Sequence, residues 1–288
     1  MATRTVRRTI RAIATSDGAG VKLRRSLGQS QGLYHDPFLM LDEFSSENPG
    51  DYIAGFPAHP HRGFETVTYL LDGHMLHEDH LGNRGDLKSG GVQWMTAGRG
   101  IVHSEMPQQL EGRMRGFQLW INLPANEKMK PAAYRDVDPS EIPAVPLPAG
   151  GNVRVISGTV EVNGQHVTGP VEARATDPSY FDVELPRGAE FTQAVPRDYS
   201  AFLYVFEGSV AVGSEEGATT LEAGTAGILS EGERVFVKAG SQGARLLVLA
   251  ARPIGEPIVQ YGPFVMNTRE EIEQALLDYQ SGALASPN

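Results

Sequence analysis

The stretch from His59 to Glu105 decides how this 288-residue chain folds; it begins HPHRGFETVTYLLDG and ends GRGIVHSE. It opens with His59 and His61 and closes with His103 and Glu105, two pairs of metal-capable side chains separated by one residue. On a β-strand, side chains at i and i+2 point to the same face, about 6.6 Å apart along the backbone. Each pair can therefore lean toward a common point, and four such side chains could enclose a metal ion.

Two runs of strand-forming residues, 65–71 and 91–96, lie between these pairs. Both runs are bounded by glycines, which is typical of antiparallel strands joined by tight turns. Such a meander can carry the second pair back beside the first. The sequence therefore predicts one metal site that is built from both pairs. The glycines of this segment are Gly73, Gly82, Gly85, Gly90, Gly91, Gly98 and Gly100.

The two motifs resemble those of the cupin barrel, and their amino-acid sequences closely resemble those of the pirin family. Three further stretches carry the same resemblance: DPFLMLDEF at 36–44, HEDHLGNRG at 77–85 and GPFVMNTREEIEQALLDYQSG at 262–282. The resemblance is weaker between Pro131 and Pro253. The resemblance implies an all-β bicupin, with two antiparallel β-barrels of the cupin or jelly-roll type and a short C-terminal helix.

The resemblance also implies the ligand set, because pirins bind their metal through the four residues that match His59, His61, His103 and Glu105. Glu65 is the competing carboxylate, since the general cupin pattern uses a glutamate a few residues after His-x-His. Its even offset from His61 would place it on the same strand face. The pirin resemblance favours Glu105, and we expect Glu65 to be a strand residue or to support a ligand.

Three more histidines, His74, His77 and His80, lie between the two motifs. Residues spaced by three do not share a strand face, and the neighbouring Gly73 and Gly82 indicate the edges of turns. We therefore do not expect a second metal site at these histidines.

The run GFQLWINLP at residues 116–124 alternates between an apolar face and a face that carries Gln118 and Trp120. One of the two faces must line the barrel. Apolar residues here and nearby could form a pocket over the metal, or they could pack as ordinary core. The candidates for this pocket are Trp94, Met95, Phe117 and Leu119.

Composition limits the classes of function. The net charge of −10 argues against direct nucleic-acid binding, which depends on clustered lysine and arginine. The absence of cysteine excludes thiolate ligands, so a metal must take nitrogen and oxygen ligands. No apolar run is long enough for a signal peptide core or a bilayer span, and we expect a cytoplasmic protein without a membrane partner. The N-terminal arginines are expected on the solvent side of strands. They are Arg4, Arg7, Arg8 and Arg11.

A proline-rich segment, residues 131–150, divides the chain. Proline lacks the amide proton that a strand ladder needs, so this segment is expected to be a linker or crossing segment. We expect an N-terminal metal-binding cupin barrel at residues 1–130. Residues 151–288 are expected to form a second cupin barrel that also carries the C-terminal helix.

The second half repeats the architecture of the first without its ligands. YVFEGSVAV at residues 204–212 parallels YLLDGHMLH at residues 69–77. When Gly208 is aligned with Gly73, no histidine falls opposite the first pair, and His166 lies far from those positions. We expect a metal-free barrel with a structural or partner-facing role.

A helix is predicted at about residues 268–281. Thr268 and Glu271 have the spacing of a capping box, and Gly282 is a plausible stop. The apolar residues of the segment recur at helical spacing, so that one face can dock on a barrel. They are Ile272, Ala275, Leu276 and Tyr279.

The ligand types suit Fe(II), Mn, Co, Ni, Cu or Zn, and the resemblance implies Fe(II). It extends to pirins with quercetinase activity, which open the central ring of a flavonol with O2 and release carbon monoxide. The implied substrates are a small aromatic, flavonol-like molecule and O2. In this interpretation Glu105, a ligand that can loosen, takes the proton of the enol hydroxyl and is the candidate catalytic residue.

The resemblance supports an alternative of a different class. Animal pirins are iron-dependent co-regulators of transcription, and some bacterial pirins bind a subunit of the pyruvate dehydrogenase complex. The chain would then be a metal-dependent, redox-sensing regulator that acts through a protein partner.

Overall fold

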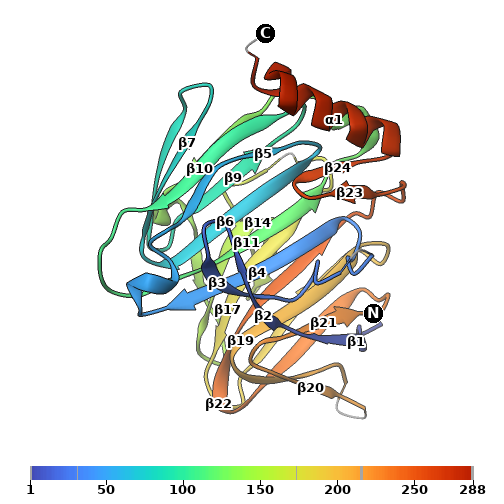
Figure 1. Ribbon diagram of the computed structural model, residues 1–288. Coiled ribbons are helices and arrows are strands. Elements are labelled where there is room, and N and C mark those ends of the chain that lie inside the picture. The colour runs from blue at the N-terminus through green and yellow to red at the C-terminus, as the bar shows by residue number, and fades with distance from the viewer. Residues whose placement is uncertain (1, 31, 173, 215–216, 287–288) are drawn as a thin grey trace. The chain divides into compact units, whose positions relative to one another are not determined.

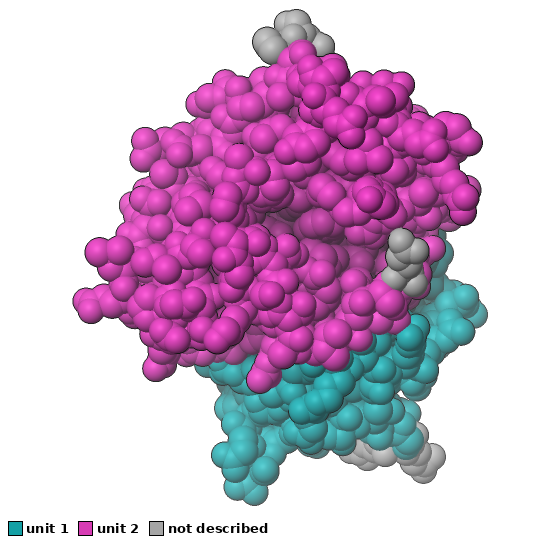
Figure 2. Space-filling view, viewed as in Figure 1, with its two compact units in different colours: residues 1–12, 140–253 teal, residues 13–139, 254–288 magenta. Residues whose placement is uncertain are grey.

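The computed structural model describes residues 2–30, 32–172, 174–214 and 217–286, which form many β-strands and one α-helix (Figure 1). The predicted all-β architecture is confirmed. The chain divides into two compact units, which Figure 2 draws in different colours. Unit 1 comprises residues 1–12 and 140–253, and unit 2 comprises residues 13–139 and 254–288.

The two ends of the chain are assigned differently from the continuous domains that the sequence predicts. β1 (Val6–Arg11) pairs with β21 (Thr225–Leu229), so the N-terminal segment belongs to unit 1. α1 (Arg269–Ser281) contacts β24 (Phe264–Met266), and both belong to unit 2 with the candidate ligands. Pairing and packing between segments far apart in the sequence produce this exchange.

The proline-rich segment 131–150 contains an edge strand of each unit. β12 (Ala133–Val137) pairs with β9 (Val92–Thr96), and β13 (Ala144–Pro146) pairs with β14 (Asn152–Ser157). Both are the last strand of their sheet's order, where a proline does not interrupt a ladder on both sides. The units divide within this segment, after residue 139.

Unit 2 is built from a seven-stranded sheet, ordered β12-β9-β6-β11-β4-β3-β2, and a four-stranded sheet, ordered β5-β10-β7-β8. Each of these two sheets has an edge strand at both ends of its order, so the expected barrel is an open pair of sheets. Side chains meet between the sheets, as Thr68 of the larger sheet and Glu105 of the smaller one do. The remaining strands are β2 (Ile13–Asp17), β3 (Val21–Arg25), β4 (Phe38–Ser46), β5 (Phe56–His61), β6 (Phe64–Asp72), β7 (His74–Asp79), β8 (Arg84–Lys88), β10 (Ile101–Pro107), β11 (Met114–Asn122) and β23 (Val259–Tyr261).

Unit 1 is built on a nine-stranded sheet in which the long strands β19 (Ser200–Val212) and β22 (Arg234–Ala251) pair with each other. Its core is a cluster of buried apolar residues that includes Phe181, Leu203 and Val237. His166 lies exposed on a separate hairpin. The remaining strands are β15 (Thr159–Val162), β16 (Gln165–Thr168), β17 (Ser179–Leu185), β18 (Glu190–Ala194) and β20 (Thr219–Glu222).

Helix α1 begins with the predicted capping box, in which the Thr268 hydroxyl accepts from the Glu271 amide and the Glu271 carboxylate accepts from the Thr268 amide. It ends at Gly282, whose φ of 79° is favourable for glycine. Ile272 and Ala275 are buried in the apolar cluster that docks the helix. Within the described ranges, no helix combines the length and apolar character needed to cross a membrane. The short 3-10 segments are Pro49–Asp51, Ala125–Glu127, Pro139–Glu141 and Ala283–Ala285.

Candidate metal centre

Three of the four predicted ligands meet on the four-stranded sheet. His59 and His61 lie on β5, and His103 lies directly opposite His59 on the neighbouring strand β10. One ring nitrogen from each histidine lies within 4.8 Å of the others, close enough to hold one metal ion. The ring centroids are 4.4 to 4.8 Å apart. The i, i+2 spacing on one strand and the register between two strands together produce this cluster.

The surroundings of the cluster keep two of its imidazoles uncharged. His61 is 3% exposed and His103 is 2% exposed. Burial lowers the pKa of each imidazole well below its ordinary value, and the neighbouring histidines lower it further. A hydrogen bond to the Pro263 carbonyl opposes this shift in the pKa of His61, but burial is the larger cause. Both rings therefore keep a lone pair at neutral pH, as metal ligation requires.

The unused ring nitrogens fit a metal ion. Among the described residues, His61 Nδ1 and His103 Nε2 are buried without a hydrogen-bond partner. The Nδ1 atom of His59 lies 2.8 Å from the Pro57 carbonyl oxygen, which leaves Nε2 of that ring to bind a metal ion. Buried nitrogens without partners are costly unless another group satisfies them. Three imidazole nitrogens suit a borderline divalent metal.

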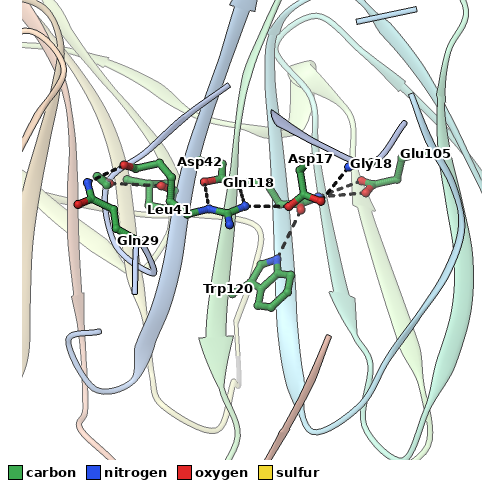
Figure 3. A network of polar contacts seen from close by, with 10 residues as sticks. Asp17, Gly18, Gln29, Leu41, Asp42, Glu105, Gln118 and Trp120 are labelled. Atoms are coloured by element: carbon green, nitrogen blue, oxygen red, sulfur yellow. Dashed lines mark hydrogen bonds and ion pairs between the residues drawn. The ribbon is translucent and has the colours of Figure 1, made fainter. Parts of the chain in front are cut away.

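Glu105 lies on the same strand as His103, two residues further on, but it is outside the three-histidine cluster. It is 3% exposed, and its oxygens accept hydrogen bonds from Thr68 Oγ1 at 3.0 Å and Gln118 Nε2 at 3.0 Å. Figure 3 shows the Gln118 amide pointing at this carboxylate. The seven-stranded sheet therefore holds the Glu105 carboxylate, and its role as the fourth ligand stays a prediction.

Glu65 lies on a different strand from His61. A turn at Gly63 separates β5 from β6, so the even offset between the two residues does not place them on one strand face. The φ of Gly63 is +89°, and a Cβ there would meet the Val265 carbonyl oxygen at 2.0 Å, which explains the glycine. The Glu65 carboxylate accepts hydrogen bonds from Trp94 Nε1 at 3.0 Å and Thr96 Oγ1 at 2.6 Å.

The three further histidines have different environments. His74 contacts Asp86, and His80 Nδ1 accepts a hydrogen bond from the Val102 amide at 3.1 Å. His77 is 2% exposed, and its Nδ1 lies 3.3 Å from His103 Nδ1. No second group of metal ligands forms here among the described residues. The contact of His77 with a candidate ligand could not be found from sequence spacing.

A cavity of about 630 Å³ adjoins the cluster and is lined by His59 and His61. Gln118 and Trp120 of β11 line it, together with Phe56. None of the four predicted pocket residues lines the cavity, and all four are buried. They are Trp94, Met95, Phe117 and Leu119.

Charged residues of β2 and β3 form another wall of the cavity. Arg25 donates to both carboxylate oxygens of Asp42, at 2.8 and 2.7 Å, and to Asp17 Oδ2 at 2.8 Å (Figure 3). These carboxylates raise the pKa of the Arg25 guanidinium, so it stays charged. Asp17 and Arg25 both line the cavity, which therefore combines polar groups with aromatic walls.

Similarity to known proteins extends over most of the chain. The family model described as Pirin matches residues 20–121, and the model described as Pirin C-terminal cupin domain matches residues 180–285. A candidate quercetin 2,3-dioxygenase of Pseudomonas aeruginosa is 55% identical over 270 residues, which are 94% of each chain.

Solved structures agree with this similarity. The crystal structure of a quercetin 2,3-dioxygenase from Acinetobacter baumannii has a TM-score of 0.89 and 34% identity, and the match covers 99% of both chains. A bacterial pirin from Escherichia coli in complex with nickel(II) has a TM-score of 0.63, over 85% of this chain and 98% of that one. Its identity of 20% shows the fold alone. Two cupin domains of the pirin type make up this chain, which belongs to the pirin family.

Proposed function

We propose that this protein is a metal-dependent dioxygenase that opens the central ring of a flavonol-like substrate with O2 and releases carbon monoxide. The observation that carries the proposal is a three-histidine cluster beside a cavity of about 630 Å³. Such a volume is in the range of sites for small organic ligands. The similarity to the Pseudomonas aeruginosa protein, at 55% identity, supports the same reaction class.

We assign the metal to His59, His61 and His103, with Glu105 as the fourth ligand. Fe(II) is the proposed ion, as the pirin resemblance implies, and Mn, Co, Ni, Cu and Zn suit the same donors. When bound, the metal would supply Lewis acidity toward an enol hydroxyl and open positions for O2. The protein residues would supply orientation, exclusion of water and a proton acceptor.

Glu105 is the proposed acceptor of the enol proton. Its carboxylate is buried beside the cluster, and Thr68 and Gln118 donate hydrogen bonds to it. The Gln118 side chain also accepts from Trp120 Nε1 at 3.4 Å, so its amide orientation is set from both ends. Because Gln118 lines the cavity, it links the carboxylate to the space where a substrate would lie.

The cavity walls suit a planar polyphenol. Phe56 and Trp120 offer flat apolar surfaces, and the Trp120 ring lies 5.4 Å from the His61 ring. Asp17 can accept a hydrogen bond from a phenolic hydroxyl while Arg25 holds its carboxylate at 2.8 Å. A planar aromatic ligand with hydroxyl groups at its rim would satisfy both kinds of wall.

The test is metal analysis of protein purified without added metal, followed by anaerobic loading with Fe(II) and measurement of oxygen uptake with a panel of flavonols. We expect oxygen consumption that depends on both the flavonol and the metal, with one carbon monoxide molecule released for each O2 consumed. A fully loaded protein that consumes no oxygen with any flavonol of the panel contradicts the proposal. A metal-dependent regulator that acts through a protein partner would then be the better account.

A further inference from the structure

We infer that His77 is a positioning residue for the candidate ligand His103: it accepts a hydrogen bond from His103 Nδ1 and so directs His103 Nε2 toward the metal. The inference rests on the proposed metal site. It concerns metal binding, and it holds whether the bound metal is catalytic or regulatory.

Strand pairing brings the two rings together. β7 runs antiparallel to β10, with His77 opposite Glu105 and Asp79 opposite His103. Residues diagonal to each other in such a ladder are within reach of aromatic side chains. The His77 and His103 ring centroids are 4.7 Å apart, and their Nδ1 atoms are 3.3 Å apart. Both side chains are 2% exposed, so water does not compete for this contact.

The nitrogen atoms define the direction of the hydrogen bond. Among the described residues, His103 Nε2 has no hydrogen-bond partner, and it is the atom free to bind a metal. A neutral ring that ligates through Nε2 carries its proton on Nδ1. His77 Nδ1, at 3.3 Å, must then be the acceptor. A fixed partner of this kind selects the tautomer and the ring orientation of a metal-binding histidine.

The remaining nitrogen of His77 has no hydrogen-bond partner in the described structure. If His77 Nδ1 accepts, its proton lies on this buried Nε2 atom. A buried polar atom without a partner is destabilising and calls for an explanation other than packing stability. His77 itself is not part of the group whose nitrogens lie within 4.8 Å of one another, so it contacts a ligand without being one.

The experiment compares His77→Phe and His77→Gln in the full-length protein. Phenylalanine keeps a ring against Tyr134, whose ring centroid is 4.9 Å from that of His77, but it removes the acceptor. Glutamine restores an acceptor oxygen. We expect His77→Phe to weaken Co(II) binding about 10- to 100-fold in a chelator competition and to alter the visible spectrum of bound Co(II). His77→Gln should recover part of both.

The matched control is His74→Phe, on the same strand. The His74 side chain is 35% exposed and contacts Asp86, so this variant should bind Co(II) as the wild type does. A His77→Phe variant with the affinity and spectrum of the wild type would overturn the inference. So would equal losses in the Phe and Gln variants, because packing alone would then explain them.

A second measurement needs no variant and decides the question even if His77→Phe does not fold. Histidine ¹⁵N shifts of the Zn-loaded wild type report which nitrogen of each ring carries the proton. We expect His103 to be protonated at Nδ1 and His77 to be protonated at Nε2. Zinc bound through His103 Nδ1, or His77 protonated at Nδ1, contradicts it. Neither test measures flavonol turnover, so both can still be interpreted if the proposed reaction does not occur.

Discussion

At the scale of single residues, Glu105 is the side chain whose chemistry separates ligation from catalysis. Glu105→Gln keeps the size and one oxygen but removes the basic carboxylate that Thr68 and Gln118 now hold. If Glu105 accepts the substrate proton, the variant should retain much of its metal and lose about a hundredfold or more in rate. Oxygen uptake and metal content, measured on one sample, check this.

The control for Glu105→Gln is Glu78→Gln on the adjacent strand β7. Glu78 is exposed and lies opposite Ser104, on the other face of the strand from His77. This variant should keep the wild-type rate and metal content. Unchanged turnover in Glu105→Gln would remove the proton-acceptor role from the account.

Burial of His61 and His103 makes the stability of the metal-free protein depend on pH. Their pKa values are lowered in the folded state, so between the folded values and the unfolded value of about 6.5 the unfolded chain binds more protons. The stability contribution is therefore present above about pH 6.5 and is lost as the pH falls. Urea unfolding across this window should show a shallower loss in His103→Asn than in the wild type, and identical slopes would contradict the assignment.

Spacing along the sequence was sufficient to identify His59 with His61 as one pair and His103 as part of a second, because side-chain alternation within a strand depends on no other part of the chain. Spacing also identified Glu105, and the family resemblance favoured it over Glu65, but the structure places it outside the histidine cluster. The contact of His77 with His103 could not be predicted. It depends on the pairing of β7 with β10, which no local pattern specifies.

At the scale of elements, the alternation along β11 defined two faces but not which one meets the metal. Gln118 and Trp120 line the cavity, whereas Phe117 and Leu119 are buried on the opposite face. The choice depends on the side of the sheet on which β5 and β10 lie. Apolar character was therefore a poor guide to the pocket, since both faces of a strand in a covered sheet are shielded from water.

Besides its apolar cluster, helix α1 is held by one ion pair near the metal site. Arg62 Nη1 lies 2.7 Å from Asp278 Oδ2, and the Arg62 side chain is 5% exposed. Asp278→Ala would leave this buried guanidinium without its carboxylate, and we expect a loss of about 1–3 kcal/mol in the free energy of unfolding. Glu273→Ala, on the exposed side of the same helix, should change it by no more than about 0.5 kcal/mol. Equal effects of the two substitutions in urea unfolding would contradict this role for the pair.

At the scale of the whole molecule, the sequence did not predict how the N-terminal segment is held. The N-terminal arginines were expected to face solvent, yet Arg4 is 1% exposed. Its guanidinium donates to the backbone carbonyls of Tyr199, Pro196 and Gly232, at 2.7 to 3.0 Å. These acceptors lie nearly two hundred residues or more away in sequence, so no local pattern identifies them.

Arg4 therefore anchors the N-terminal segment to unit 1. Arg4→Met should leave one buried and two partly buried carbonyls without their Arg4 donor and lower the free energy of unfolding by about 1–3 kcal/mol. Arg7→Met, at an exposed position on β1, is the control and should have little effect. Chemical denaturation of the two variants measures the difference, and indistinguishable midpoints would show that the Arg4 contacts contribute nothing.

The central claim is that one metal ion binds per chain at the cluster on β5 and β10. The most direct measurement is a crystal structure of metal-loaded protein, with the ion located by anomalous scattering. We expect one ion about 2.0–2.2 Å from nitrogens of His59, His61 and His103, with Glu105 completing the ligand set. An ion at His77 and His80, Glu65 in place of Glu105, or no ion at the three histidines would contradict it.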